Sequence, residues 1–202
     1  DREVVRVVTP GTVIEDAVLE QNVNNYLVSV IVNGDEAGLA YADITTAEFA
    51  TSQFPASQLS VELTRLKPSE VLIPGGQEGL ILEDGWTATV LDTTSFDLEW
   101  SKESLRSHFG VASLEPYGCE GLPLAIRAAG AVIDYLSRNQ KSALGQLSSL
   151  YTYSTESFMA LDPQTRRNLE LFEGGRWGDL GSSLLSVLDR TRTSMGGRLL
   201  RR

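Results

Sequence analysis

The chain has 202 residues, of which 42% are hydrophobic and 22% are charged, and its formal net charge is −10. This composition is ordinary for a soluble globular protein and allows a buried core in one or two domains. No apolar run approaches the roughly 18 to 20 residues that a membrane span needs, and no basic-then-apolar leader opens the chain. The single cysteine, Cys119, excludes an internal disulfide. We therefore expect a cytoplasmic protein without a membrane contact.

The charge is divided unevenly along the chain. Residues 1–115 carry 6 Lys and Arg against 19 Asp and Glu, whereas residues 116–202 carry 11 against 8. Nucleic-acid binding draws much of its strength from neutralising phosphates, so the acidic first part is not expected to grip DNA by itself. The arginines of the second part are interpreted as a solvated or partner-paired face. This change of charge favours a domain boundary between 115 and 116.

A run of strands opens the chain. Residues 4–8 are mostly apolar and β-branched, and residues 26–32 predict a further strand that ends at the hairpin dipeptide Asn33-Gly34. The returning strand is predicted over 39–44 and a third over 48–54. Because the connections between these three strands are short, they are expected to pair antiparallel.

Helices and strands then alternate. The sequence predicts a helix over 58–66 capped by Ser57, strands over 70–73 and 87–91, and a helix over 101–109 that Gly110 ends. Strands followed by this alternation are typical of an α/β layer domain, which we place at 1–115.

Residues 121–140 predict a long amphipathic helix, which we interpret as the joint between two domains. The remainder reads as helix and loop: no clear period over 144–153, a helix over 165–172 that Asp162-Pro163 starts, a glycine-rich loop over 174–181, a helix that Ser183 caps, and a helix over 195–202. This predicts an all-α part over 116–202. No stop signal follows the last helix, so we expect it to continue in a longer protein.

Residues that usually carry chemistry are few. The only histidine, His108, has no spacing typical of a catalytic triad, and one histidine with one cysteine cannot supply a usual zinc site. Both residues are interpreted as structural. The glycine-rich segments at 74–79 and 174–181 lack the phosphate-binding pattern and are interpreted as turns.

The carboxylates leave one enzymatic alternative open. A three-stranded meander followed by a helix and another strand resembles the ribonuclease H-like fold, whose enzymes hold divalent metals with converging acids. Here the first strand contains no acid, and only Asp43 and Glu62 are candidates. The acid set is incomplete, so the resemblance favours the fold without nuclease activity. A free-standing metal-dependent hydrolase remains the alternative.

Several longer runs resemble the MutS family of DNA mismatch repair proteins. They are 7–12 (VVTPGT), 38–49 (GLAYADITTAEF), 128–131 (AAGA), 159–162 (MALD), 165–170 (TRRNLE), 183–189 (SLLSVLD), Thr191, Thr193, 195–196 (MG) and 198–200 (RLL), which together cover nearly the whole chain.

The resemblance implies a ribonuclease H-like connector domain, a mixed sheet with flanking helices, followed by the beginning of the helical core or lever domain. The intact family protein is a dimeric ATPase that uses ATP and Mg, binds mismatched DNA and recruits MutL. Its mismatch-reading Phe-x-Glu segment and its phosphate-binding loop would lie before Asp1 and after Arg202. The resemblance therefore implies a connecting role, with no catalytic residue, cofactor or metal site in these 202 residues.

The resemblance also implies a partner surface. In the family, MutL contacts the connector around the helix that matches 101–109, which places Lys102, Glu103 and Ser104 at the contact. Only the apolar and glycine positions of this helix match the family form. An independent protein-interaction module that uses the acidic first part is a third interpretation.

One expectation concerns the last helices. Leu184, Leu188, Leu199 and Leu200 are expected to lack cover within the chain, which predicts packing between chains or mobility at these helices.

Overall fold

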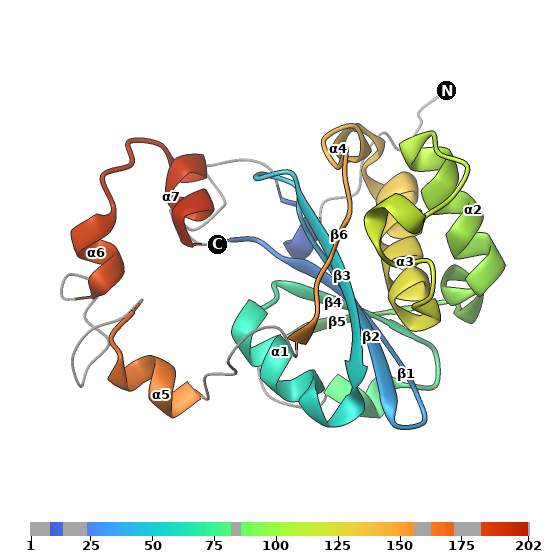
Figure 1. The fold of residues 1–202 in the computed structure, drawn as a ribbon, viewed down its shortest axis with the longest axis horizontal. Coiled ribbons are helices and arrows are strands. Elements are labelled where there is room, and N and C mark those ends of the chain that lie inside the picture. Colours follow the sequence, from blue (N-terminus) through green and yellow to red (C-terminus); the bar gives the residue numbers. More distant parts are fainter. Residues whose placement is uncertain (1–8, 14–23, 82–85, 156–162, 172–182, 202) are drawn as a thin grey trace. The chain divides into compact units, whose positions relative to one another are not determined.

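The structure, a computed structural model, describes residues 9–13, 24–81, 86–155, 163–171 and 183–201 (Figure 1). The chain divides into two compact units. The first comprises Asp1–Ile14 and Asn25–Thr155, and the second comprises Glu15–Asn24 and Glu156–Arg202. The strand predicted over 4–8 and the loop predicted over 174–181 lie outside the described residues.

A mixed six-stranded sheet forms the centre of the first unit. Its order is β5-β4-β1-β2-β3-β6, in which β1, β2 and β3 are antiparallel and the pairs β1–β4, β4–β5 and β3–β6 are parallel. The strands are β1 (Leu27–Asn33), β2 (Glu36–Asp43), β3 (Glu48–Pro55), β4 (Glu70–Pro74), β5 (Thr87–Leu91) and β6 (Tyr151–Thr152).

The antiparallel meander is confirmed. Asn33 pairs with Glu36 across a two-residue loop, and Gly34 adopts φ 60°, which a glycine reaches without a steric penalty. The local hairpin signal therefore fixed both the turn and the register of the first two strands.

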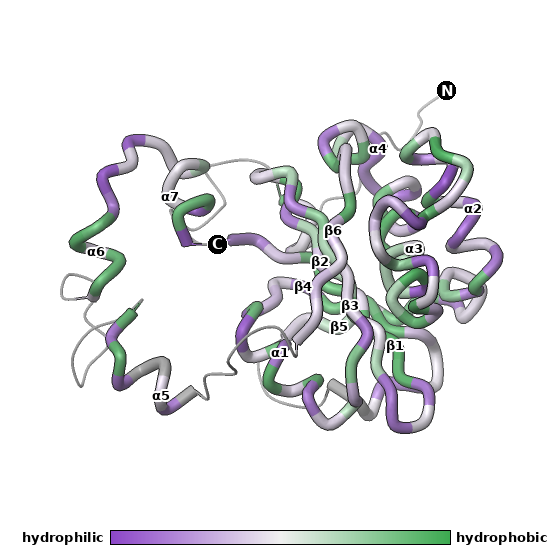
Figure 2. Tube along the Cα trace, viewed as in Figure 1, coloured by the Kyte–Doolittle hydropathy of each residue, from purple (hydrophilic) through white to green (hydrophobic). Residues whose placement is uncertain are grey.

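Helices cover both faces of the sheet. On one face lie α2 (Leu98–Phe109) and α3 (Pro123–Asn139), and on the other lies α1 (Leu59–Leu66) (Figure 1). Side chains of β1 alternate between the two cores: Leu27 and Ile31 belong to the α3 side, and Val28 and Val30 to the α1 side. Apart from Ser29 and the terminal Asn33, this central strand is hydrophobic (Figure 2), because both of its faces are covered.

Two glycines allow α3 to lie close to its neighbours. A Cβ on Gly38 of β2 would overlap the backbone of Leu124, and a Cβ on Gly130 of α3 would overlap Ser101 of α2. The helix therefore approaches the sheet on one side and α2 on the other so closely that neither glycine position has room for a side chain.

This arrangement corrects the predicted domain boundary between 115 and 116. The structure places residues 116–155 in the first unit, and α3 is a covering helix of the sheet rather than a joint. The reason is that α3 is buried both by the sheet and by α2. After α4 (Lys141–Leu144), β6 then adds to the sheet beside β3, and its two residues are too few to show a period in the sequence.

Helix ends agree in part with the predictions. Gly110 ends α2 at φ 67° as expected, but α2 begins at Leu98, three residues earlier than predicted, because the Asp97 carboxylate accepts a hydrogen bond from the Trp100 N–H. Ser57 does not cap α1; Gln58 holds that position without a side-chain hydrogen bond, after a 3₁₀ turn.

The described part of the second unit contains three short helices: α5 (Pro163–Asn168), α6 (Leu184–Leu188) and α7 (Ser194–Arg201). The cap at Ser183 is confirmed, since its Oγ accepts a hydrogen bond from the Ser186 N–H. The helix predicted to run to 172 ends at Asn168. The four leucines expected to lack cover, Leu184, Leu188, Leu199 and Leu200, are each exposed.

Candidate functional site

The two acids considered as metal ligands are buried and engaged by the chain itself. At the end of β2, Asp43 accepts hydrogen bonds from the Asn25 N–H at 3.2 Å and from the N–H and Oγ1 of Thr45 at 2.8 and 2.6 Å. Two of these donors are backbone amides that cannot be turned away. The carboxylate therefore serves the turn after β2 and the beginning of β1.

Glu62 of α1 serves a different set of donors. Its Oε2 accepts from the Arg65 Nη2 at 2.8 Å and from the Tyr153 hydroxyl at 3.0 Å, and the Arg65 guanidinium lies over the Tyr153 ring. Burial, together with the charge of Glu62, raises the pKa of the Tyr153 phenol. Tyr153 therefore stays protonated as the donor to Glu62.

A third carboxylate, Glu48 of β3, accepts from the hydroxyls of Tyr26 and Tyr41 at 3.2 and 3.1 Å. Asp43, Glu48 and Glu62 thus each accept from their own chain, at three different places in the first unit. Among the residues that the structure describes, no three His, Cys, Asp or Glu side chains are grouped so that they could hold a metal ion. The carboxylates do not fit the metal site that the ribonuclease H-like resemblance raised, and nothing in the described structure favours the hydrolase alternative.

Sequence reasoning missed Glu70, a buried carboxylate that accepts hydrogen bonds from four different residues. It lies buried at the start of β4 and accepts four hydrogen bonds. They come from the Thr9 hydroxyl at 2.6 Å, the Gly11 N–H at 3.0 Å, the Thr89 hydroxyl at 2.7 Å and the Tyr135 hydroxyl at 2.7 Å. A lone acid in an otherwise apolar buried strand is the signal that could have identified it.

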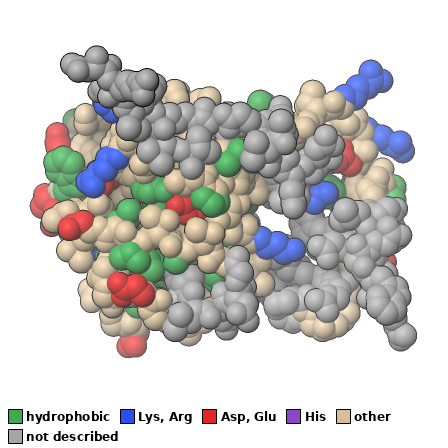
Figure 3. Space-filling model, turned by 180° about the vertical axis from the view of Figure 1, so that it is seen from behind, with side chains coloured by type: hydrophobic (Ala, Val, Ile, Leu, Met, Phe, Trp, Pro, Cys, Tyr) green, Lys and Arg blue, Asp and Glu red, His purple; other side chains and the backbone are tan. Residues whose placement is uncertain are grey.

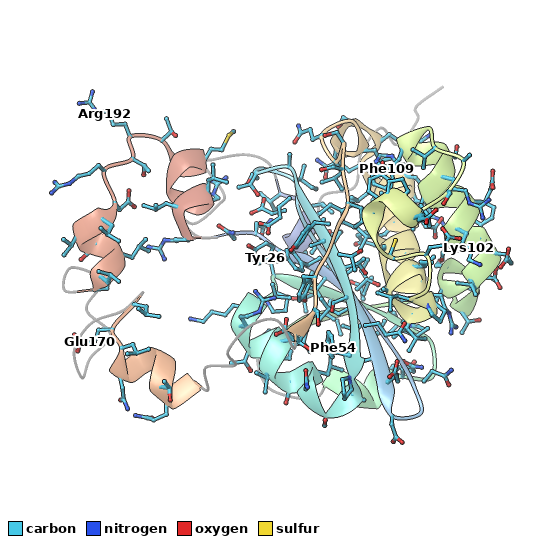
Figure 4. All side chains as sticks on the ribbon, viewed as in Figure 1. Tyr26, Phe54, Lys102, Phe109, Glu170 and Arg192 are labelled. Carbon is cyan, nitrogen blue, oxygen red and sulfur yellow. The ribbon has the colours of Figure 1, made fainter. Side chains whose placement is uncertain are left out.

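The α2 surface contains the three residues predicted to contact a partner. Glu103 is exposed and Ser104 is half-buried, whereas Lys102 (Figure 4) pairs with Glu99 through Nζ and Oε1 at 3.4 Å. Trp100, which sequence reasoning missed, is 55% exposed and lies three and four residues before Glu103 and Ser104. These three share one helix face, and Lys102 lies off it.

The remaining candidate residues take part in packing or in hydrogen bonds within the chain. The His108 Nε2 lies 2.7 Å from the Leu147 carbonyl oxygen, and its ring packs edge-on against Phe109. Cys119 is buried, and burial raises the pKa of its thiol. In the glycine turn after β4, the Glu78 carboxylate itself accepts from the Gly76 N–H at 3.1 Å. An anion at that amide would meet a carboxylate.

None of the described helices has the length and apolar character to cross a membrane. The fold and the candidate site define a mixed α/β domain whose buried carboxylates hydrogen-bond to its own chain, followed in sequence by a helical unit. Two family matches agree with this description. The family described as MutS domain II matches residues 25–148, and MutS domain III matches residues 164–202. The chain therefore belongs to the MutS family of DNA mismatch repair proteins.

Relatives along the whole chain support this assignment. The DNA mismatch repair protein MutS of Dehalococcoides mccartyi (strain CBDB1) is 45% identical over 202 residues, which is 100% of this chain and 24% of that protein. The MutS of Synechococcus elongatus is 44% identical over 218 aligned residues, 100% of this chain and 25% of its own length. The MutS of Trichodesmium erythraeum is 43% identical over 217 aligned residues, which cover 100% of this chain and 24% of that protein. The chain thus spans about a quarter of the curated relatives it matches.

Proposed function

We propose that this chain is the connecting part of a MutS-type mismatch repair protein and has no catalysis of its own. Residues 25–148 act as the connector domain, and residues 164–202 begin the core or lever domain. The observation that carries this proposal is the order of the two family matches, domain II and then domain III, along one chain. The engagement of the buried acids by internal donors supports a mechanical rather than a catalytic role.

The connector is proposed to have a ribonuclease H-like fold. Its support is the topology: a three-stranded antiparallel meander, two further strands parallel to β1, and helices on both faces. On this proposal the domain uses the architecture as a rigid spacer, because the acids that such a fold would need for metal-assisted hydrolysis are committed elsewhere.

We assign the activities of the whole protein to residues outside this chain. The intact protein is proposed to be a cytoplasmic homodimer that binds mismatched DNA and hydrolyses ATP with Mg. The excess of Asp and Glu over Lys and Arg in residues 1–115 agrees with this division, and Figure 3 shows several acidic side chains on one face of the first unit. A surface of this sign does not favour binding to a phosphate backbone.

The proposed partner surface for MutL is the outer face of α2. Lys102, Glu103 and Ser104 were predicted there from the resemblance, and the exposed indole of Trp100 adds an apolar group to the same face as Glu103 and Ser104. Exposed tryptophans beside polar groups are typical centres of protein interfaces.

A segment exchange tests the proposed function. These 202 residues replace the matched segment of the Dehalococcoides mccartyi MutS, and the chimera is introduced into a bacterial strain that lacks MutS and expresses the D. mccartyi MutL. We expect the mutation frequency to fall to the level that the unaltered D. mccartyi protein gives. A soluble, dimeric chimera that leaves the frequency at the level of the deficient strain would contradict the proposal.

A further inference from the structure

Three crossings connect the two compact units along the chain, after Ile14, before Asn25 and after Thr155. On the first unit, a different buried carboxylate accepts hydrogen bonds from the chain beside each crossing. We infer that Glu70, Asp43 and Glu62 are positioning residues that fix the three crossings to the first unit. This inference rests on the proposed connecting role and deepens it, because it names the groups that hold the points of attachment.

Glu70 holds the segment before the first crossing. Its Oε2 accepts from the Thr9 hydroxyl at 2.6 Å and from the Gly11 N–H at 3.0 Å, while its Oε1 is held by Thr89 and Tyr135. The fit is close, since a Cβ on Gly11 would lie 2.9 Å from the Glu70 Cβ. The segment is thus fastened to β4, and through the carboxylate to β5 and α3.

Asp43 holds the second crossing. Its Oδ2 accepts the Asn25 N–H at 3.2 Å, and its Oδ1 is held by Thr45. The Asn25 side chain extends the attachment, because its Nδ2 donates to the Pro10 carbonyl oxygen at 3.0 Å. The chain that leaves toward the second unit and the chain that returns from it are therefore tied to each other.

Glu62 holds the third crossing through Tyr153. The Tyr153 hydroxyl donates to Glu62 at 3.0 Å, its N–H donates to the Thr51 carbonyl at 3.1 Å, and its carbonyl accepts from the Ser52 hydroxyl at 2.7 Å. Two residues further on, the Thr155 hydroxyl donates to the Gln58 Oε1 at 2.8 Å. The chain is held in this way up to its last residue in the first unit.

Carboxylates suit this purpose for a physical reason. A buried carboxylate is tolerated only while donors surround it, and here the donors include groups of the crossing segments. A crossing that detached would leave the charge without part of its donors, so detachment is strongly opposed. Apolar contacts alone would tolerate sliding of a segment, whereas hydrogen bonds to a fixed acceptor define its position.

Hydrogen exchange of individual amides in the 202-residue chain tests this inference. Three variants are compared with the parent. Exchange is read at the Gly11 amide for Glu70→Gln, at the Asn25 amide for Asp43→Asn, and at the amide of residue 153 for Tyr153→Phe. Each is expected to raise exchange about tenfold at its own crossing and to leave the amides of the central strands β1 and β2 unchanged. Tyr151→Phe is the matched control for Tyr153→Phe, because Tyr151 lies in the same segment with its side chain 57% exposed.

The outcomes separate the inference from the proposed function. Exchange that rises equally throughout the first unit, or does not rise at the crossings, overturns the inference. Tyr153→Phe removes a single hydroxyl and keeps the ring, so it still tests the third crossing if the two carboxylate variants fail to fold. Failure of the unsubstituted chimera to repair mismatches would overturn the proposed function and leave the exchange result standing.

Discussion

Single carboxylates illustrate how strongly tertiary surroundings decide a residue's role. Asp43 and Glu62 are the acids that a sequence pattern marks for metal chemistry. Each is bound instead by one donor near in the sequence, Thr45 or Arg65, and by one from further along the chain, Asn25 or Tyr153. Glu70 accepts from four residues, of which Thr9 and Tyr135 lie more than 60 positions away in opposite directions. Such partners have no signal in the local sequence, so the roles of these carboxylates could not be predicted.

Replacement of Glu70 by Ala is expected to destabilise the chain by about 3 kcal/mol, because four donors lose their buried acceptor. Thr89→Val, which removes only one of these donors, is the matched comparison and should cost about 1 kcal/mol. Urea unfolding followed by circular dichroism measures both. Equal losses of stability for the two variants would show that Glu70 does not act as the shared acceptor of the four donors.

Tyr135 predicts a specific alkaline response. Burial, and then the adjacent Glu70 carboxylate, raise the pKa of Tyr135 to about 12, whereas an unfolded tyrosine titrates near 10. Since the folded pKa is the higher one, the stabilisation from the neutral phenol is complete below pH about 10 and is lost as the pH rises through about 12. Between these pH values, the midpoint temperature of thermal unfolding should fall more steeply for the parent than for Tyr135→Phe. Parallel curves would contradict this assignment.

Helices and strands were predicted well wherever the signal was local. The meander, the hairpin at Gly34 and the stop of α2 at Gly110 are confirmed. The start of α2 was missed because the Asp97 cap lies before the apolar pattern begins. Periodicity marks where a helix buries residues, and a cap marks where it starts, so the two signals can differ by a turn.

Gly130 tests the close packing of α3 on α2. Gly130→Ala is expected to cost about 1 to 3 kcal/mol, although alanine favours helices, because the new methyl group overlaps Ser101. Gly145→Ala is the control, since no atom lies within 4 Å of a Cβ at that position and its φ of −62° suits any residue. Chemical denaturation distinguishes them. A Gly130→Ala chain as stable as the control would disprove the close contact.

The cap of α2 gives a second prediction for a helix. Asp97→Ala should cost about 1 kcal/mol, because the Trp100 N–H loses its acceptor at the first turn. Glu103→Ala, an exposed substitution on the same helix, should change stability by less than about 0.5 kcal/mol. The midpoint of thermal unfolding measures the difference between the two variants.

At the scale of the whole molecule, the exposed surfaces decide which partners can bind. Trp100→Ala is expected to weaken binding of MutL to the chimera about tenfold or more, because exposed aromatic groups often dominate an interface. Val61→Ala is the control, an exposed apolar residue on α1 at the opposite face of the sheet. Surface plasmon resonance with immobilised MutL gives the two affinities. Equal weakening by both variants would place the contact elsewhere.

The sequence by itself determined the family, the strands of the meander and the positions of most helices, because these depend on short runs and local periodicity. Only the tertiary structure decided that α3 covers the sheet instead of joining two domains, that β6 extends the sheet, and that three buried carboxylates hold distant segments. An amphipathic stripe shows that a helix is buried but not what buries it. A carboxylate shows that donors are needed but not which segments supply them, and both are settled only when remote parts of the chain meet.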